Sequence, residues 1–167
     1  MPRSIGRPVT DGEVDPTIAI RRSELRDVRA IMEVDRLVYP KPWSQDMTIN
    51  QTTGDQRVHF VAEVDDRIIG HGGIALLAGD AHITSIAVDP TKQRRGYGQA
   101  VLTRLIDAAC ENECDGITLE VRASNAAAIA LYEAAGFTSA GVRRGYYQNN
   151  GEDAVIMWKD LRPHGNS

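Results

Sequence analysis

Residues 83–98 read ITSIAVDPTKQRRGYG, and they combine an apolar strand pattern with a cationic loop that contains two glycines. The alternation of apolar side chains predicts a strand that ends at Asp89. Lys92, Arg94 and Arg95 then place three cations within four positions, directly before the first glycine. An apolar stripe with helical spacing follows. The stretch therefore predicts a strand, a short cationic loop and a helix.

The junction between this strand and this helix has the chemistry of an anion site. The first N–H groups of a helix have no carbonyl partner within it, and they lie at the positive end of the helix dipole. Gly96 and Gly98 would let a phosphate or pyrophosphate approach the backbone. Alternatively, the glycines form only a tight turn beside solvated arginines. The chain has no P-loop pattern and no dinucleotide-binding glycine pattern, which disfavours both of those folds.

Hydrophobic periodicity predicts further strands and helices on both sides of this stretch. Upstream we expect a strand over 17–21, helices over 23–38 and 44–52, and an antiparallel meander over 58–64, 67–77 and 81–88. Downstream we expect a helix over 97–112, a strand over 117–121, a helix over 124–136, and strands over 137–147 and 154–159. The first helix should be capped by Ser23 and should bury Val28, Ile31, Met32 and Leu37. This order indicates a mixed sheet with helices on its faces, in the α/β or α+β class.

Length and charge indicate one globular domain. The chain has 167 residues and a formal net charge of −4. We assign 17–161 to a single domain, and 1–16 and 162–167 to flexible tails. The acidic balance disfavours a nucleic-acid coat or a polybasic membrane binder. No apolar run approaches the roughly 20 residues of a spanning helix, and the first ten residues lack the apolar core of a secretory signal. We expect a cytoplasmic protein that binds neither nucleic acid nor membrane.

Cysteine and histidine are too sparse to indicate a metal site. Cys110 and Cys114 are the only cysteines, and the four histidines are scattered without ligand spacing. A structural zinc ion needs four ligands, so we expect free thiols and no metal.

Glu120 lies in the middle of the predicted strand over 117–121. Ile117, Leu119 and Val121 point to one face of that strand, whereas Glu120 points to the other. A carboxylate in a central strand is costly unless it borders a wet cleft or has a partner. The sequence leaves open whether Glu120 faces such a cleft, lies on an exposed face, or pairs with an Arg such as Arg122.

The helix that follows places an amide and a phenol on one face. Asn125, Ile129 and Tyr132 are spaced by four and three residues, so the first and last lie two turns or about 10 Å apart. Both polar groups could serve a ligand. Equally, Asn125 could cap the helix and Tyr132 could cover the edge of the core.

Five segments together resemble the GNAT superfamily of N-acetyltransferases. They read QRRGYG at 93–98, PWS at 42–44, LEVRASNAAAIALYE at 119–133, GF at 136–137 and RGYY at 144–147. The first resembles the acetyl-CoA pyrophosphate signature of that superfamily, and the others resemble its RimI branch of ribosomal-protein-alanine N-acetyltransferases. The resemblance spans about 17–161 and includes the order of elements. The long N-terminal tail and residues 40–41 depart from it.

The resemblance implies a fold, a cofactor and catalytic groups. The implied fold is a mixed, mostly antiparallel sheet of about seven strands with four helices, and the co-substrate is acetyl-CoA. Glu120 corresponds to the general base and Tyr132 to the general acid of a direct transfer. A bulge near Val88 should turn an N–H toward the thioester oxygen. The implied cofactor contacts are the backbone of Ile86, Ala87 and Val88 for the pantetheine arm, the backbone of Arg94, Arg95, Gly96, Tyr97, Gly98 and Gln99 for the pyrophosphate, and the side chain of Asn125.

The implied substrate is the N-terminal Ala of a small-subunit ribosomal protein. We expect Trp43, Tyr146 and Tyr147 to wall a pocket for the first residue, and Asp35, with Glu33, to face basic residues further along the peptide; all of these could instead be surface or packing residues. An α-amine has a pKa of about 7.7–8.0 against about 10.4 for Lys, so a modest base suffices for it. Two alternatives remain: acetylation of Lys side chains or small amines, and a non-catalytic acetyl-CoA-binding module.

Overall fold

The computed structural model describes residues 17–93 and 95–163, which form seven strands and four α-helices. The strands are β1 (Ala19–Arg22), β2 (Arg57–Val64), β3 (Arg67–Leu77), β4 (Asp80–Val88), β5 (Gly116–Arg122), β6 (Thr138–Tyr147) and β7 (Glu152–Asp160). The helices are α1 (Val28–Val38), α2 (Gln45–Thr53), α3 (Tyr97–Glu111) and α4 (Ala126–Ala134), with short 3-10 turns at Leu25–Asp27 and Pro90–Lys92. The predicted order of elements and the fold class are confirmed. Of the expected tails, residues 1–16 and 164–167 lie outside the described part.

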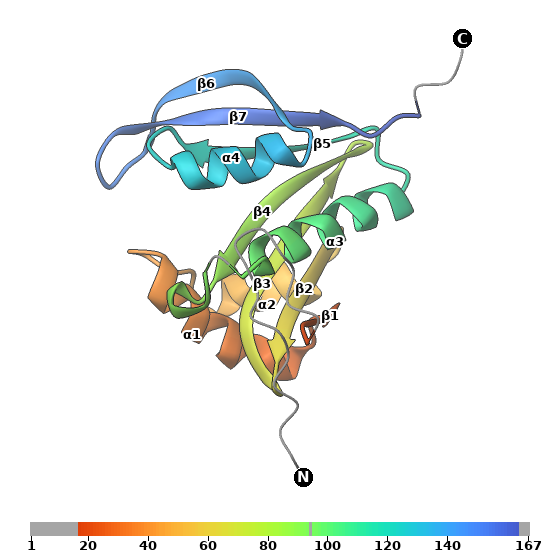
Figure 1. Cartoon of the computed structure of the whole chain (residues 1–167), viewed down its shortest axis with the longest axis vertical. Helices are drawn as coiled ribbons and strands as arrows, with labels where there is room; N and C mark the ends of the chain where they lie inside the picture. The colour runs from red at the N-terminus through yellow and green to blue at the C-terminus, as the bar shows by residue number, and fades with distance from the viewer. Residues whose placement is uncertain (1–16, 94, 164–167) are drawn as a thin grey trace.

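The seven strands form one sheet in the order β1-β2-β3-β4-β5-β7-β6 (Figure 1). All neighbours are antiparallel except β4 and β5, which run parallel. Their ladder joins only Asp80–His82 to Gly116–Thr118. Beyond those three pairs the strands part, and Figure 1 shows β4 running away from β5. The sheet is therefore open along the second half of both strands.

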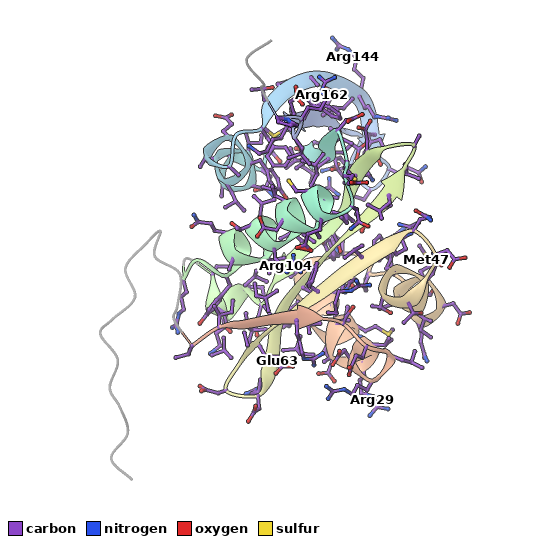
Figure 2. The ribbon with its side chains drawn as sticks, turned by 90° about the vertical axis from the view of Figure 1, so that its right-hand side faces the viewer. Arg29, Met47, Glu63, Arg104, Arg144 and Arg162 are labelled. Carbon is purple, nitrogen blue, oxygen red and sulfur yellow. The ribbon has the colours of Figure 1, made fainter. Side chains whose placement is uncertain are left out.

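The main core lies between α3 and one face of the sheet. Val101, Leu102 and Leu105 on α3 are fully buried against strand residues such as Phe60. Gly72 on β3 lies directly under this helix, because a Cβ built there would come 2.6 Å from Val101 Cγ1. A larger residue at this position would separate the helix from the sheet. On the surface of the molecule, charged side chains project away from the ribbon, as Figure 2 shows for Arg29 and Arg144.

The other face of β2, β3 and β4 is covered by α1 and α2, which lie behind the sheet in Figure 1. Val28 and Ile31 are buried there as predicted, but Leu37 is exposed and Val34 is buried in its place. The prediction for Leu37 was wrong because Leu37 follows Val28 by about two and a half turns of α1, which points it away from the buried face.

The start of the first helix also differs from the prediction. Ser23 does not cap it. The Ser23 N–H and hydroxyl both donate to the carbonyl oxygen of His59, at 2.9 and 3.0 Å. The helical turn is preceded instead by Glu24, whose N–H donates to the Asp27 carboxylate at 2.7 Å. By contrast, Ser44 caps α2, since its hydroxyl accepts from the Met47 N–H at 3.2 Å.

A bulge in β4 lies at Thr84 and not near Val88, so that prediction was wrong. Ser85 is opposite Gly73 and Ile83 is opposite Ile74, which leaves Thr84 as the extra residue. Its hydroxyl donates to the Gly73 carbonyl oxygen at 3.3 Å. An extra residue reverses the alternation of side chains. As a result Ser85 turns to the α1 face of the sheet.

Candidate active site

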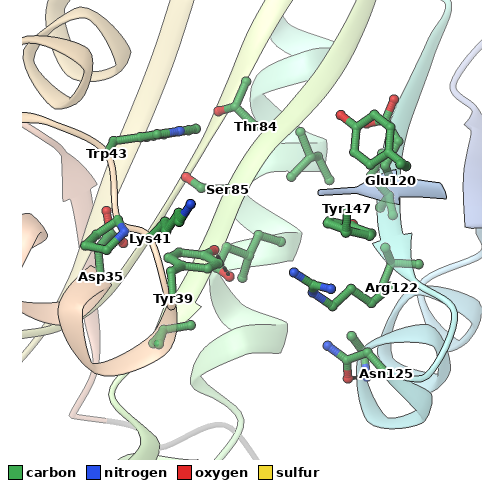
Figure 3. Close-up of a pocket in the computed structure, with 18 of the residues that line it drawn as sticks. Asp35, Tyr39, Lys41, Trp43, Thr84, Ser85, Glu120, Arg122, Asn125 and Tyr147 are labelled. Carbon is green, nitrogen blue, oxygen red and sulfur yellow. Dashed lines mark hydrogen bonds between the residues drawn. The ribbon is translucent and has the colours of Figure 1, made fainter. Parts of the chain in front are cut away.

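A cavity of about 650 Å³ lies where β4 and β5 part. Its walls come from the connection between α1 and α2, from β4 and β5, and from α4 and the end of β6 (Figure 3). Of the sequence-predicted residues, it brings together Glu120, Tyr132, Asn125, Trp43, Asp35, Tyr146, Tyr147 and Ile86.

Glu120 points from β5 into this cavity and has a polar partner there. Its side chain is 14% exposed, and Oε2 lies 2.5 Å from His82 Nε2 on β4. The guanidinium of Arg143 is more distant, with Nε 3.8 Å from Oε1. Arg122, which the sequence offered as a partner, instead contacts Glu152 at 3.2 Å. Glu120 thus borders the cleft and is paired, and its partner His82 was not predicted.

Tyr132 lines the same cavity from α4 and is almost entirely buried. Its ring meets Phe137 edge to face, with 5.8 Å between the ring centroids. Burial, and to a lesser extent Tyr147, raises the pKa of Tyr132 to about 12. The phenol therefore stays protonated at neutral pH and is able to donate a proton.

Asn125 combines a capping role with a place in the cavity wall. Its Oδ1 accepts from the Ala128 N–H at 3.1 Å, so it caps α4, as the alternative interpretation of the sequence had it. Capping occupies only the carbonyl oxygen of the amide. Asn125 lies at the α4 end of the cavity in Figure 3.

The main chain of β4 presents polar groups to the gap between β4 and β5. The Asp89 N–H donates to Ile69 O at 2.7 Å, and hydrogen-bonded pairs recur at every second residue of an antiparallel ladder. Ala87 therefore bonds to β3, whereas the N–H and C=O groups of Ile86 and Val88 point away from it. Among the expected backbone contacts, Ile86 and Val88 face the gap and Ala87 does not.

Tyr39 is a cavity residue that the sequence did not single out. It follows α1, and its hydroxyl donates to the Ile86 carbonyl oxygen at 3.2 Å. Burial and the nearby Asp35 raise the pKa of this tyrosine. Only its place just before two prolines could have drawn attention to it.

The N-terminus of α3 matches the predicted anion site in part. Gly96 precedes the helix in the left-handed conformation, at φ 81°, and as a glycine it has no side chain with which to cap the helix. Tyr97 is buried in the core, so only its backbone can serve a ligand. Gly98 and Gln99 continue the first turn, and Arg95 is exposed in the loop before it. Arg94 lies outside the described residues.

Trp43, Tyr146 and Tyr147 all line the cavity, and Figure 3 shows Trp43 on the side of the connection between α1 and α2 and Tyr147 on the opposite side. The two tyrosine rings meet edge to face with centroids 5.1 Å apart. The guanidinium of Arg122 lies 3.9 Å from the centre of the Tyr147 ring and orients it.

Asp35 was expected to face basic residues of a peptide, or else to be a surface or packing residue. It lines the cavity but is buried, and its Oδ1 lies 2.6 Å from His71 Nε2. His71 Nδ1 is 3.0 Å from His59 Nε2, and His59 Nδ1 is 2.9 Å from the Ser23 hydroxyl. Asp35 therefore ends a buried chain of polar groups beneath the wall of the cavity. Glu33, its companion in the prediction, is exposed.

Residues 17–93 and 95–163 contain neither a metal site nor a membrane-spanning helix. In that part of the chain no three His, Cys, Asp or Glu side chains gather in a way that could hold a metal ion. Its helices are also too short or too polar to cross a membrane. Cys110 and Cys114 are free thiols, the first exposed and the second buried.

Residues 28–137 match the acetyltransferase (GNAT) family. The [ribosomal protein bS18]-alanine N-acetyltransferase of Salmonella typhimurium is 40% identical over 136 residues, 78% of this chain and 89% of that protein. The RimI N-alpha-acetyltransferase of Mycobacterium tuberculosis is 34% identical over 158 residues, 92% of this chain and 93% of that protein. The crystal structure of the ribosomal-protein-S18-alanine N-acetyltransferase from Escherichia coli superimposes with a TM-score of 0.82 at 34% identity, over 90% of this chain and 97% of that one.

These matches agree with the open sheet, the cavity at its opening and the glycine before α3. They confirm the RimI-like resemblance, and enzymes of this family take acetyl-CoA as the acetyl donor. The chain is an N-acetyltransferase that belongs to the GNAT family.

Proposed function

We propose that this enzyme acetylates the α-amine of a protein N-terminus, with the N-terminal Ala of ribosomal protein bS18 as its target. The relatives are named for that reaction and are up to 40% identical. The observation that carries the proposal is the placing of Glu120 and Tyr132 in one cavity at the opening between β4 and β5. A ribosomal target also places the enzyme in the cytoplasm.

The residues around the opening fit the donor. Acetyl-CoA supplies the acetyl group as a thioester. The outward main-chain groups of Ile86 and Val88 would hold its pantetheine arm as an added strand does. The first N–H groups of α3, together with the loop 94–96, would hold its pyrophosphate. Asn125 would donate its amide N–H group.

The chemistry assigns one proton transfer to each of two side chains. Glu120 removes a proton from the attacking amine, directly or through a water molecule. The Val88 N–H stabilises the negative charge that develops on the carbonyl oxygen. Tyr132 gives a proton to the departing thiolate. An α-amine suits this arrangement better than Lys, because neutralising Lys costs about 3.5 kcal/mol more at neutral pH.

Aromatic residues line the cavity from two sides and would bound the space for the first residue of the peptide. Trp43 lies on the side of the connection between α1 and α2, and Tyr146 and Tyr147 line the cavity from β6, where Arg122 holds the Tyr147 ring in place. A methyl side chain would enter between these rings without displacing them.

The proposal is tested with a peptide that begins with Ala and carries one internal Lys, incubated with acetyl-CoA and analysed by intact mass. We expect one acetyl group to be added, and none when the α-amine is blocked beforehand. Equal acetylation of the blocked peptide would show that the enzyme prefers Lys side chains. Calorimetric binding of acetyl-CoA without any transfer would instead show a non-catalytic binding module.

Replacing Tyr132 by Phe is expected to lower kcat about 100-fold, the lower end of the range for general acid–base catalysis, because a thiolate is already a good leaving group. The ring contact with Phe137 would survive the change. Because the pKa of Tyr132 is about 12, the wild-type rate should show no loss from this group between neutral pH and about pH 11. Thiol release at saturating substrates measures kcat, and a Phe variant as fast as wild type would remove Tyr132 from the role.

A further inference from the structure

His82 occupies a special position on β4. It is the last residue of this strand that pairs with β5, where its partner is Thr118. Paired residues on neighbouring strands point to the same face of a sheet, and so do residues two apart on one strand. Glu120 therefore shares a face with His82. This register brings the imidazole to the carboxylate at the point where the strands part.

The contact between the two side chains fixes their hydrogen-bonding roles. Nε2 of His82 lies 2.5 Å from Oε2 of Glu120. An ionised carboxylate only accepts hydrogen bonds, so Nε2 must carry the proton and donate it. In the neutral ring Nδ1 then holds a lone pair. Within the described part of the chain no group hydrogen-bonds to Nδ1, and the imidazole is 30% exposed at the cavity wall.

Other charged groups near the pair contribute little to holding it. Arg143 on β6 is 3.8 Å from Oε1 and its side chain is 57% exposed, so solvent screens this ion pair. The remaining titratable or charged residues of the cavity are Asp35 on α1, Tyr39 and Lys41 after it, Arg122 on β5, Tyr132 on α4, and Tyr146 and Tyr147 on β6. Asp35 is bonded to His71, and Arg122 to Glu152. His82 is thus the group in closest contact with Glu120.

We propose that His82 is the positioning residue of Glu120. Its Nε2–H holds Oε2 and leaves Oε1 to take the proton of the amine. Without this donor the carboxylate would be free to turn away from the position of the amine. The assignment rests on the proposed role of Glu120.

Two substitutions separate the hydrogen bond from the imidazole ring. His82→Gln keeps an N–H donor, whereas His82→Ala removes it. We expect His82→Ala to lower kcat about 10- to 100-fold, the loss expected when a reacting group is no longer oriented. We expect His82→Gln to keep kcat within about threefold of wild type, because its amide N–H can still donate to Oε2.

The readout is kcat and KM for the Ala peptide, measured separately. A positioning role lowers kcat and leaves KM for the peptide unchanged, whereas a general loss of structure changes both. Arg143→Gln is the matched control, since it removes the other charged neighbour of Glu120, and it should keep kcat within about threefold of wild type. Wild-type kcat for His82→Ala, the same loss in His82→Gln as in His82→Ala, or the same loss in Arg143→Gln would overturn the proposal.

Two further measurements distinguish the loss of a positioning residue from a damaged site and from failure of the proposed function. Acetyl-CoA affinity, measured by calorimetry, should be unchanged in each variant, which shows that the site is intact. Nitrogen NMR of the histidine-labelled wild type should show the Nε2–H form of His82 at neutral pH, and the opposite tautomer would overturn the proposal without any substitution. If the wild type acetylates no α-amine at all, the proposed function fails whatever the state of His82.

Discussion

Replacing Glu120 by Gln is expected to lower kcat by about 10²–10⁴-fold, the usual contribution of a general base. The amide has the shape of the carboxylate and can still accept from the His82 N–H, but it cannot take a proton from the amine. Only 14% of this side chain is exposed, so water replaces it poorly. Steady-state thiol release with the Ala peptide at saturation measures the effect.

The affinity for acetyl-CoA should not change in this variant, because the proposed donor contacts lie on β4, α3 and α4. Calorimetry provides that control. Glu111→Gln is the matched substitution, since Glu111 is exposed on α3 and pairs only with Arg104 among the residues described. It should leave kcat unaltered. A Glu120→Gln enzyme that turns over at the wild-type rate would remove Glu120 from catalysis.

Replacing His71 by Leu is expected to destabilise the fold by about 3–5 kcal/mol, which is the cost of leaving the buried Asp35 carboxylate without its hydrogen-bond partner. Asp35 and His71 are both almost completely buried, and their contact is 2.6 Å long. The substitution would also remove the partner of His59 Nε2. Urea unfolding, followed by circular dichroism, measures the loss.

The double variant Asp35→Leu, His71→Leu is the control for this effect. It removes both polar groups together and should recover part of the stability, whereas a simple packing defect would make it worse than the single variant. A His71→Leu protein within about 1 kcal/mol of wild type would show that the contact between Asp35 and His71 does not stabilise the fold.

The pH dependence of stability follows from His59 in the same chain. Burial lowers its pKa from the ordinary 6.5 to about 3, so the folded state keeps it neutral. The unfolded chain binds the proton more readily between those values, and stability therefore rises with pH in this window. The contribution of His59 is complete above about pH 6.5 and is lost as the pH falls toward 3.

Local sequence patterns were enough to predict most of the fold, and they also drew attention to Glu120 and Tyr132. Apolar periodicity and turn residues predicted the strands and helices, and the alternation in 117–121 marked Glu120 as unusual. The sequence did not indicate a role for His82. Its contact with Glu120 joins residues 38 apart and depends on the pairing of His82 with Thr118 in the folded sheet. The bulge was misplaced for the same reason, since Thr84 is extra only relative to β3.

Asp35 has a partner that no pattern in the sequence indicates. A charged residue on an amphipathic helix is normally solvated, so Asp35 was expected to be available to basic residues of a peptide. Its actual partner, His71, lies 36 residues away on β3, and the chain then passes to His59 on β2. No spacing within one element reveals such a set of contacts. They exist only once three elements have packed together.

The aperture of this enzyme is set by backbone geometry. Three residue pairs are enough to join the halves of the sheet, and the strands diverge from there. Rim side chains can therefore be exchanged through evolution without closing the aperture. Substitutions at the rim could therefore change which amine the enzyme accepts. The same acyl donor would still bind to the main chain of β4.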